Sequence, residues 1–590
     1  MARKKSEKIV NYPERLEAVN EIYLHDKMKL FAGYKEIVKK IQKTLEHIDS
    51  PIIAFDGFPT TNWHLINHNF SNYFGEKEKG IKFFDIRNCM KDDKELSMLF
   101  DEYLTDDPVF GKIYKGELIS FFDKNEIRKL KQHLKSNENE IIVVYGTGSG
   151  LSELLDFYDM VIYFDLTREE MLKRQRSQGS DFKTQSIGPK QSYYIDFPIN
   201  DKHRKHVLVC ADFYVDSNDE EFPVMIGKFE FERLLEQLTK QPFRLKPIYE
   251  PGPWGGQWLK EVRKLPAEWN NCAWSYEVIA PEMSFFLSSP DNPVVLEIPW
   301  KTFITMFYSQ IVGNVSPEKF CAEFPVRFDY LDTYNGGDLS VQVHPTTEYI
   351  KENFNECYHQ GEMYYIVESK EGRKVNLGLN EEINISDFKK AAERAEKEHE
   401  PFNYKEFVNG IDVSKHDIVM IPPGTVHGSR EGLVVLEISS TTYRYTFKIY
   451  DHLRPDLGGS MRPIHLEHAF NVIDPDRRTE WVKNNLKIEP VMLRKESGVE
   501  EYLIADRKEF FHKVHRIDFN KEYTDYTHGS FHVLTLVEGN KISINVSDKD
   551  FMGIDLNYSE TVIIPAAVKK YEVINKGDEP CKIVKALLKE

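Results

Sequence analysis

Short hydrophobic runs alternate with charged, helix-length segments over the first 240 residues of the chain. Residues 52–57, 141–146 and 161–165 are apolar runs that end in glycine or polar turns. Residues 124–134 and 168–178 have the length and charge of surface helices. Strands that alternate with helices usually pair side by side in a parallel sheet. The pattern therefore predicts a parallel α/β domain over residues 1–240.

The pattern changes near residue 241, where Pro242, Pro247, Pro251 and Pro253 cluster with three glycines. Such a cluster marks a junction between domains. β-type apolar runs dominate from there on, at residues 326–331, 339–343, 363–367, 418–421, 433–438 and 445–450. Strands at this density, separated by Pro and Gly turns, predict an antiparallel barrel or jelly roll over residues 241–480.

Two further segments complete the predicted organisation. Residues 386–408 interrupt the strands with an Ala- and Glu-rich stretch, which predicts a solvated helical insert with Ser386 as its N-cap. Residues 481–590 contain paired apolar runs at 531–539 and 561–567 and predict a second β-rich domain. A chain of 590 residues is too long for one hydrophobic core, so several domains are expected.

Composition narrows the classes of function. The charged residues number 78 basic and 95 acidic, a net charge of −17, and an acidic surface repels phosphate backbones, so nucleic acid is not an expected partner. A phosphorylated substrate would need a local basic pocket. No run of about 18 apolar residues occurs, which predicts neither a signal peptide nor a membrane span. The six scattered cysteines contain no Cys-x-x-Cys pair, which favours a cytoplasmic enzyme with reduced, mostly buried thiols.

Four side chains have the chemistry of a metal site. Gln342 and His344 are two residues apart in a β-prone run, so on a strand they share one face. Glu362 and His427 follow in later β-type segments. Nitrogen and oxygen donors without thiolate favour a catalytic divalent ion, most simply Zn²⁺ with an open position. Each histidine also has a purely structural interpretation: His344 as a core histidine, and His427 as the end of a Pro-Pro-Gly turn.

These segments, in this order, resemble type I mannose-6-phosphate isomerase, a metal-dependent cupin family. Pro-Trp-Gly-Gly at 253–256 and Thr-Phe-Lys-Ile-Tyr-Asp-His-Leu-Arg at 446–454 agree with the family, and the resemblance spans about 245–475. It implies a catalytic cupin domain, a C-terminal cupin-like domain without ligands, and one Zn²⁺ per chain on Gln342, His344, Glu362 and His427. The implied reaction interconverts mannose 6-phosphate and fructose 6-phosphate through an enediol. A phosphorylated sugar is the expected partner, and a homo-oligomer is compatible with the sequence.

The resemblance also suggests catalytic residues: Glu437 as the base, with Lys448 and Arg454 toward the substrate. A buried structural carboxylate is the competing interpretation of Glu437, and His359 is a weaker alternative base. Two departures concern the substrate, because Gln360 replaces a family lysine and Lys448 replaces a family arginine, whose planar fork lysine lacks. Either Arg454 or Arg444 holds the phosphate, or the substrate differs.

Residues 163–174 resemble the strand and lid-helix entry of nucleoside and nucleotide kinases. No Gly-x-x-x-x-Gly-Lys-[Ser/Thr] sequence occurs, at residues 56–63 or elsewhere, so the groups that grip β- and γ-phosphates are missing. We therefore expect a degenerate P-loop-kinase-like domain that serves packing, assembly or regulation. Two alternatives stay open: a regulatory sugar-binding cupin that kept its metal, and a bifunctional enzyme with an active nucleoside-kinase-like half.

Overall fold

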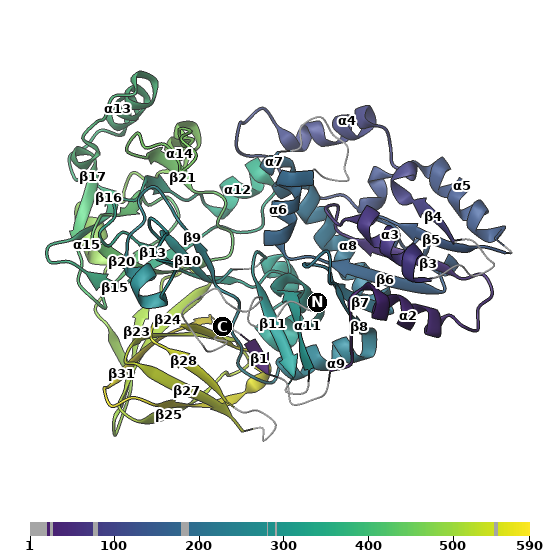
Figure 1. The fold of residues 1–590 in the computed structure, drawn as a ribbon. Helices are drawn as coiled ribbons and strands as arrows, with labels where there is room; N and C mark the ends of the chain where they lie inside the picture. The colour runs from purple at the N-terminus through teal and green to yellow at the C-terminus, as the bar shows by residue number, and fades with distance from the viewer. Residues whose placement is uncertain are drawn as a thin grey trace.

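The computed structural model describes residues 21–23, 28–74, 81–137, 139–178, 188–279, 281–289, 292–547 and 553–589. An α/β lobe lies beside a β-rich part, and a small sheet with helix α11 lies between them (Figure 1). The predicted absence of a signal peptide concerns the first 20 residues, which lie outside the described residues.

The N-terminal lobe is built on a seven-stranded sheet. Its order is β2 (Leu30–Ala32), β8 (Val224–Gly227), β7 (Phe213–Asp216), β6 (Met160–Asp165), β3 (Ile52–Gly57), β5 (Ile141–Tyr145) and β4 (Ile81–Asp85). The strands β7 to β4 are parallel, and β8 and β2 join as antiparallel strands. The parallel sheet predicted from the alternation of strands and helices is confirmed.

Helices cover both faces of this sheet because its strands are apolar on both sides. Helices α2 (Tyr34–Thr44) and α3 (Trp63–Phe74) pack on one face, against residues such as Ile53 and Val143. Helix α5 (Lys124–Lys135) packs on the other face against Ile142 and Val144. Helices α6 (Arg168–Gln178) and α8 (Phe197–Cys210) follow β6 and lie on the side toward α11 (Figure 1).

A small unit that the sequence pattern does not predict joins the lobe to the β-rich part. Strands β1 (Glu21–Tyr23), β11 (Ser284–Ser289) and β12 (Asn292–Pro299) form one sheet, followed by α11 (Trp300–Val312). The helix is buried on several sides, so its sequence lacks the amphipathic period that reveals surface helices. The Glu297 backbone N–H donates to Asp216 Oδ2 at 2.9 Å, which ties the unit to β7.

Residues 248–450 supply two facing sheets. One has the order β18 (Ile418–Ile421), β15 (Glu362–Ser369), β20 (Leu433–Ser440), β13 (Val326–Asp332), β10 (Trp274–Val278) and β9 (Ile248–Glu250). The other has the order β17 (Val408–Asp412), β16 (Lys374–Leu379), β19 (His427–Ser429), β14 (Val341–Val343) and β21 (Phe447–Tyr450). Every pairing is antiparallel, in agreement with the predicted jelly-roll type of packing.

Helices cover the outer face of the second sheet. They are α12 (Thr347–Phe354), α13 (Ile385–Glu398) and α14 (Leu466–Val472), and their apolar residues share one core with Val341, Val343, Phe447 and Ile449. The predicted helical insert is therefore present as α13. Its predicted N-cap is wrong, however: the Asn384 side chain accepts a hydrogen bond from the Ser386 N–H, so the cap lies two residues earlier than expected.

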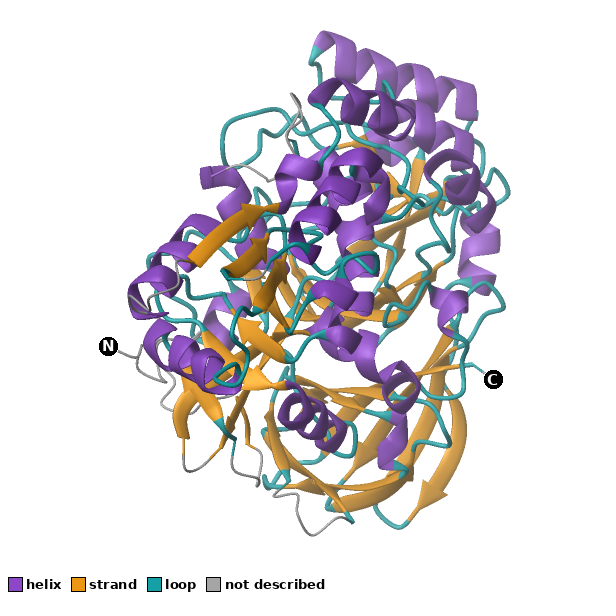
Figure 2. Cartoon of the chain, turned by 90° about the vertical axis from the view of Figure 1, so that its right-hand side faces the viewer, coloured by secondary structure: helices purple, strands orange, loops and turns teal. Residues whose placement is uncertain are grey.

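Residues 491–588 form a second pair of curved antiparallel sheets (Figure 2). One contains β22 (Val491–Glu496), β23 (Val499–Ala505), β24 (His512–Phe519), β31 (Cys581–Leu588), β26 (His532–Glu538) and β29 (Thr561–Ile564). The other contains β25 (Glu522–Tyr526), β30 (Lys570–Asn575), β27 (Lys541–Val546) and β28 (Ile554–Asn557). Their own apolar core includes Ile517, Leu534 and Ile583.

The structure bears on the redox state of the cysteines and on the possibility of a membrane-spanning helix. Cys321 and Cys357 form a disulfide, so the expectation of reduced thiols is wrong for this pair, while Cys89, Cys210, Cys272 and Cys581 are free. Over the part of the chain that the structure describes, no helix has both the length and the apolar character needed to cross a bilayer.

Candidate metal centre

Three of the four predicted ligands meet between the two facing sheets. His344 directly follows β14, His427 begins β19, and Glu362 begins β15 on the opposite sheet. Glu362 Oε2 lies 2.8 Å from His344 Nε2 and 3.0 Å from His427 Nε2. One ligand atom from each residue falls within 4.8 Å of the others, and all three side chains are buried. Positions far apart in the sequence thus form one cluster.

The hydrogen bonds of the two histidines decide which nitrogen faces the cluster. His344 Nδ1 is 3.3 Å from the Tyr445 carbonyl, and His427 Nδ1 is 2.9 Å from the Thr425 carbonyl. Because a carbonyl only accepts, both Nδ1 atoms carry the proton, and in neutral imidazoles both Nε2 atoms then present lone pairs. Burial lowers the pKa of His344, which favours its neutral form.

Two lone pairs therefore point at a carboxylate that also only accepts. Burial alone would raise the pKa of Glu362, but positive charge and hydrogen bonds from histidines protonated on Nε2 would hold that pKa well below its usual range. A bound divalent cation would take the place of those protons and leave both imidazoles neutral, with Glu362 charged in either case. Its second oxygen, Oε1, is buried and has no hydrogen-bond partner among the described residues. Three converging acceptors and an orphaned carboxylate oxygen form an arrangement that a divalent cation satisfies, so the donor set fits Zn²⁺.

Gln342, the fourth predicted ligand, lies beside the cluster. It is the cross-strand partner of His427, and its Nε2 is 3.3 Å from His427 Nε2. Its Oε1 accepts a hydrogen bond of 2.8 Å from Ser340 Oγ. Since the two ends of an amide are assigned from their hydrogen bonds, a flip of the Gln342 amide presents its oxygen to the cluster while Ser340 accepts instead.

Glu437 stands next to this cluster on β20. Its cross-strand partners are Tyr364 on β15 and Asp329 on β13. Glu437 Oε1 accepts hydrogen bonds from Arg327 Nη1 at 3.2 Å, Gln360 Nε2 at 3.3 Å and Ser439 Oγ at 3.0 Å. Burial raises the pKa of Glu437 well above its usual range, and the charges of Asp329 and Glu362 add to this, while Arg327 opposes it.

Arg327 and Asp329 are site residues that sequence reasoning missed. Both belong to β13, where charged residues at 327 and 329 alternate with the apolar Phe328 and Tyr330 in a fully buried strand. Charged residues at every second position of such a strand were the available signal, because they place charge on one inward face. Arg327 also supplies a cation beside Glu437, on the same carboxylate oxygen that Gln360 contacts.

Lys448 and Arg454 belong to a basic group around one carboxylate. Lys448 is the cross-strand partner of Gln342, so the two side chains share the inner face of the sheet. Lys448 Nζ lies 3.5 Å from Asp451 Oδ2, Arg454 Nη2 lies 3.1 Å from Oδ1, and Arg462 Nη1 lies 2.9 Å from Oδ2. Burial, with repulsion from Arg462, lowers the pKa of Lys448 to about 8. Three basic side chains thus face one acid.

The two weaker candidates lie elsewhere. Both ring nitrogens of His359 are engaged, Nδ1 with Thr347 Oγ1 at 2.7 Å and Nε2 with the Glu509 carbonyl at 2.8 Å. Arg444 points to the N-terminal lobe, where Nη1 donates to the Tyr193 carbonyl at 3.0 Å. Neither residue is part of the cluster at His344, Glu362 and His427.

The loop after β3 in the N-terminal lobe leaves little space. Asp56 Oδ2 is bonded to His203 Nε2 at 2.8 Å and accepts from the Gly150 N–H at 2.6 Å. The cavity lined by Phe58, Pro59 and Thr60 measures about 10 Å³. That volume is close to a single water molecule, and no phosphate fits in it.

Comparisons with known proteins match different parts of the chain to different families. Residues 33–240 match a domain of unknown function (DUF8485). Mannose-6-phosphate isomerase ManA of Bacillus subtilis (strain 168) is 27% identical over 250 residues, covering 41% of this chain and 72% of the relative. The putative mannose-6-phosphate isomerase YvyI of the same organism is 23% identical over 346 residues, covering 57% of this chain and 96% of the relative. The chain is thus similar to cupin-type mannose-6-phosphate isomerases over part of its length.

A solved structure of the mannose 6-phosphate isomerase from Bacillus subtilis covers 58% of this chain and 99% of its own, with 20% identity and a TM-score of 0.46. A putative mannosephosphate isomerase from Archaeoglobus fulgidus covers 59% and 98%, with 19% identity and a TM-score of 0.44.

Proposed function

We propose that this chain is a zinc-dependent aldose–ketose isomerase that interconverts mannose 6-phosphate and fructose 6-phosphate. The observation that carries the proposal is the convergence of His344 Nε2, His427 Nε2 and Glu362 with an unpaired buried carboxylate oxygen. The similarity to mannose-6-phosphate isomerases over the same part of the chain supports this choice of reaction.

One Zn²⁺ per chain would be held by Gln342, His344, Glu362 and His427. When bound, it would supply Lewis-acid stabilisation of negative charge on the substrate oxygens. The histidines are held in the required tautomer by the carbonyls of Tyr445 and Thr425. This second layer of hydrogen bonds orients the ligands before the metal arrives.

Glu437 is the residue that we propose to move the proton between C2 and C1. Arg327, Gln360 and Ser439 all donate to its Oε1, and no described residue donates to Oε2. The three donors fix the carboxyl group, and Oε2 is left for the substrate. The raised pKa makes the Glu437 carboxylate a stronger proton acceptor than an exposed glutamate, as a general base requires.

The basic group of Lys448, Arg454 and Arg462 is the part of the site that we propose for the phosphate or the oxyanion. Three cations face the single charge of Asp451, so the group retains an excess of positive charge in a chain of net charge −17. This arrangement is the local basic pocket that a phosphorylated substrate requires.

For residues 1–240 we propose a degenerate nucleoside-kinase-like domain that does not transfer phosphate, followed by the catalytic cupin over 241–480 and the cupin-like domain over 481–590. The missing phosphate-loop lysine and the small volume at Phe58 to Thr60 support this assignment. A cytoplasmic location and a homo-oligomer remain predictions from the sequence.

An isomerase assay on the full chain tests the proposal. The zinc-loaded protein should convert mannose 6-phosphate to fructose 6-phosphate, lose activity on chelation and regain it with Zn²⁺. A panel of other aldose and ketose 6-phosphates defines the sugar. A metal-loaded protein that turns over none of these sugars would favour the alternative, a regulatory cupin.

A further inference from the structure

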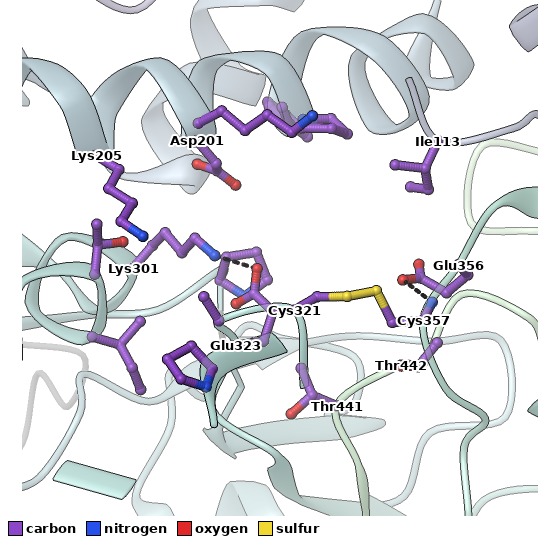
Figure 3. A pocket seen from close by; sticks show the side chains of 18 of the residues that line it. Ile113, Asp201, Lys205, Lys301, Cys321, Glu323, Glu356, Cys357, Thr441 and Thr442 are labelled. Atoms are coloured by element: carbon purple, nitrogen blue, oxygen red, sulfur yellow. Dashed lines mark hydrogen bonds and ion pairs between the residues drawn. A yellow bond between two sulfur atoms is a disulfide. The ribbon is translucent and has the colours of Figure 1, made fainter. Parts of the chain in front are cut away.

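A cavity of about 670 Å³ lies between the N-terminal lobe, α11 and the catalytic cupin. Asp201 and Lys205 on α8 form one wall, Lys301 on α11 another, and Thr441, Thr442 and the Cys321–Cys357 disulfide close it from the cupin (Figure 3). Cavities of ~300–1,000 Å³ at domain interfaces are the usual size and place of small-molecule sites.

The cavity is basic in an acidic protein. Its lining contains three acids and six cations, which are Asp201, Glu323 and Glu356 against Lys115, Arg168, Lys202, Lys205, Lys301 and Arg444. Arg168 and Lys301 are buried, with 4% and 6% of their surface exposed, whereas Lys205 is exposed at the edge and makes no hydrogen bond or ion pair with a described residue. Arg168 pairs with Asp201 at 3.2 Å and Lys301 pairs with Glu323, but the six cations still outnumber the three acids of the lining, and this excess of positive charge favours an anion.

Several buried polar atoms of the lining have no hydrogen-bond partner among the described residues. The donors are Arg168 Nη1 and the Tyr308 hydroxyl, and the acceptor is Glu323 Oε2, whereas Asp201 Oδ1 lies 3.4 Å from Arg204 Nη1 in an ion pair. Buried polar groups are nearly always hydrogen-bonded, so several orphans around one cavity point to a bound group. Arg168 Nη1 is 3.7 Å from Glu282 Oε1, beyond hydrogen-bond distance. The missing partner must accept from some of these atoms and donate to others.

The cavity is separate from the metal cluster. None of Gln342, His344, Glu362, His427 or Glu437 lines it. The two sites share one chain segment: Tyr358 lines the cavity, and Gln360, two residues later, donates to Glu437.

We propose that this cavity binds a small phosphorylated sugar unit, either a hexose phosphate or the ribose phosphate of a mononucleotide. Phosphate oxygens would accept from Arg168, Lys205 and Tyr308. Sugar hydroxyls would donate to Asp201 and Glu323. Phe197, Ile304 and Met306 supply an apolar wall for a sugar face or a base. The proposal does not rest on the isomerase activity.

Isothermal titration of the purified full chain tests it, with AMP and mannose 6-phosphate as separate probes. The titrations use protein whose metal has been removed by a chelator, so that the metal centre does not contribute. Lys205→Glu reverses the charge at the edge of the cavity, Tyr308→Phe removes one orphan hydroxyl, and Lys43→Glu is the matched control on an exposed lysine of the same lobe.

We expect at least one probe to bind, and Lys205→Glu to weaken its binding by about tenfold or more, the usual effect of losing a charge-assisted hydrogen bond. Tyr308→Phe should weaken binding by a few-fold and Lys43→Glu should leave it unchanged. Binding of AMP alone identifies a nucleotide, and binding of mannose 6-phosphate a hexose phosphate. Failure of both probes, or equal affinity in Lys205→Glu and Lys43→Glu, overturns the proposal and leaves the isomerase assignment untouched.

Discussion

Glu437→Gln is the sharpest test of the proposed chemistry. The substitution keeps the shape of the side chain but removes the group that accepts a proton. Positioned acid–base groups contribute ~10²–10⁴-fold to rate, so turnover should fall by that factor, which corresponds to ~3–5 kcal/mol in activation free energy.

The structure also bounds the effect on stability. In the Glu437→Gln variant the amide oxygen can still accept from Arg327, Gln360 and Ser439, so the hydrogen bonds now made to Oε1 are retained. The Arg327 bond loses its charge assistance, a loss of about 1–2 kcal/mol. Removing an acid crowded by Asp329 and Glu362 offsets part of this loss. We therefore expect a folded protein with a small change in unfolding temperature.

Three measurements separate the outcomes. Elemental analysis should find the same zinc content as in the native protein, and circular dichroism the same fold. Turnover of mannose 6-phosphate should drop, and exchange of solvent deuterium into C2, which an enediol route permits, should drop with it. Near-normal turnover by Glu437→Gln, with loss of turnover in His359→Ala, would refute the assignment of Glu437.

Further substitutions test the other parts of the molecule. His427→Ala should remove most of the zinc, because the remaining ligands bind it poorly, and His416→Ala is the control; full zinc content in His427→Ala rules the site out. Lys448→Ala should weaken substrate binding or turnover, whereas Lys448→Arg should be tolerated or improve activity. An inactive Lys448→Arg variant together with a fully active Lys448→Ala variant would argue against a role of Lys448 in the reaction. The full chain should show no ATP hydrolysis or transfer that depends on Asp56, and turnover abolished by Asp56→Ala would restore the kinase alternative. Burial raises the pKa of Asp196 from 3.8 to about 7, so the folded protein binds this proton more tightly than the unfolded chain does. The stabilisation of the folded state by this proton is fully present below about pH 4 and is lost as the pH rises to about 7. Asp196→Asn should therefore raise the free energy of unfolding at pH 8, by up to ~4 kcal/mol from 1.36 kcal/mol per pKa unit, and leave it nearly unchanged at pH 4; an equal change at both pH values, measured by denaturant unfolding, contradicts the assignment.

The periodic parts of the fold could be predicted because each strand or helix carries its own pattern. Residues 52–57 and 418–421 form strands β3 and β18 with the predicted bounds, and α5 extends one residue past the predicted segment. Helix α11 could not be predicted in this way, since burial on several sides leaves no polar face to mark its period. The disulfide joins cysteines 36 residues apart, and no spacing rule pairs them.

The candidate site also has a part that the sequence could predict and a part that it could not. The candidate metal ligands could be proposed because their residue types are rare in buried strands and their order resembles a known family. The residues that surround the ligands could not be predicted, because their positions depend on the register of the strands. Asp329 faces Glu437 only through the pairing of β13 with β20. A shift of one residue would turn Arg327 and Asp329 to the other face of the sheet.

The N-terminal lobe also supports the residues around the candidate site. Arg444 stacks on Tyr193 of the lobe at 4.5 Å, and Arg327 lies 4.9 Å from the ring of the adjacent residue, Tyr443. Arg327 in turn holds Glu437. Phe110 of the lobe packs against Phe354, Tyr445 and Phe447, beside the carbonyl that orients His344. The lobe therefore contacts Arg444 and the aromatic surface beside Tyr445, so a domain without a phosphate loop still has a physical reason to be retained next to the candidate metal centre.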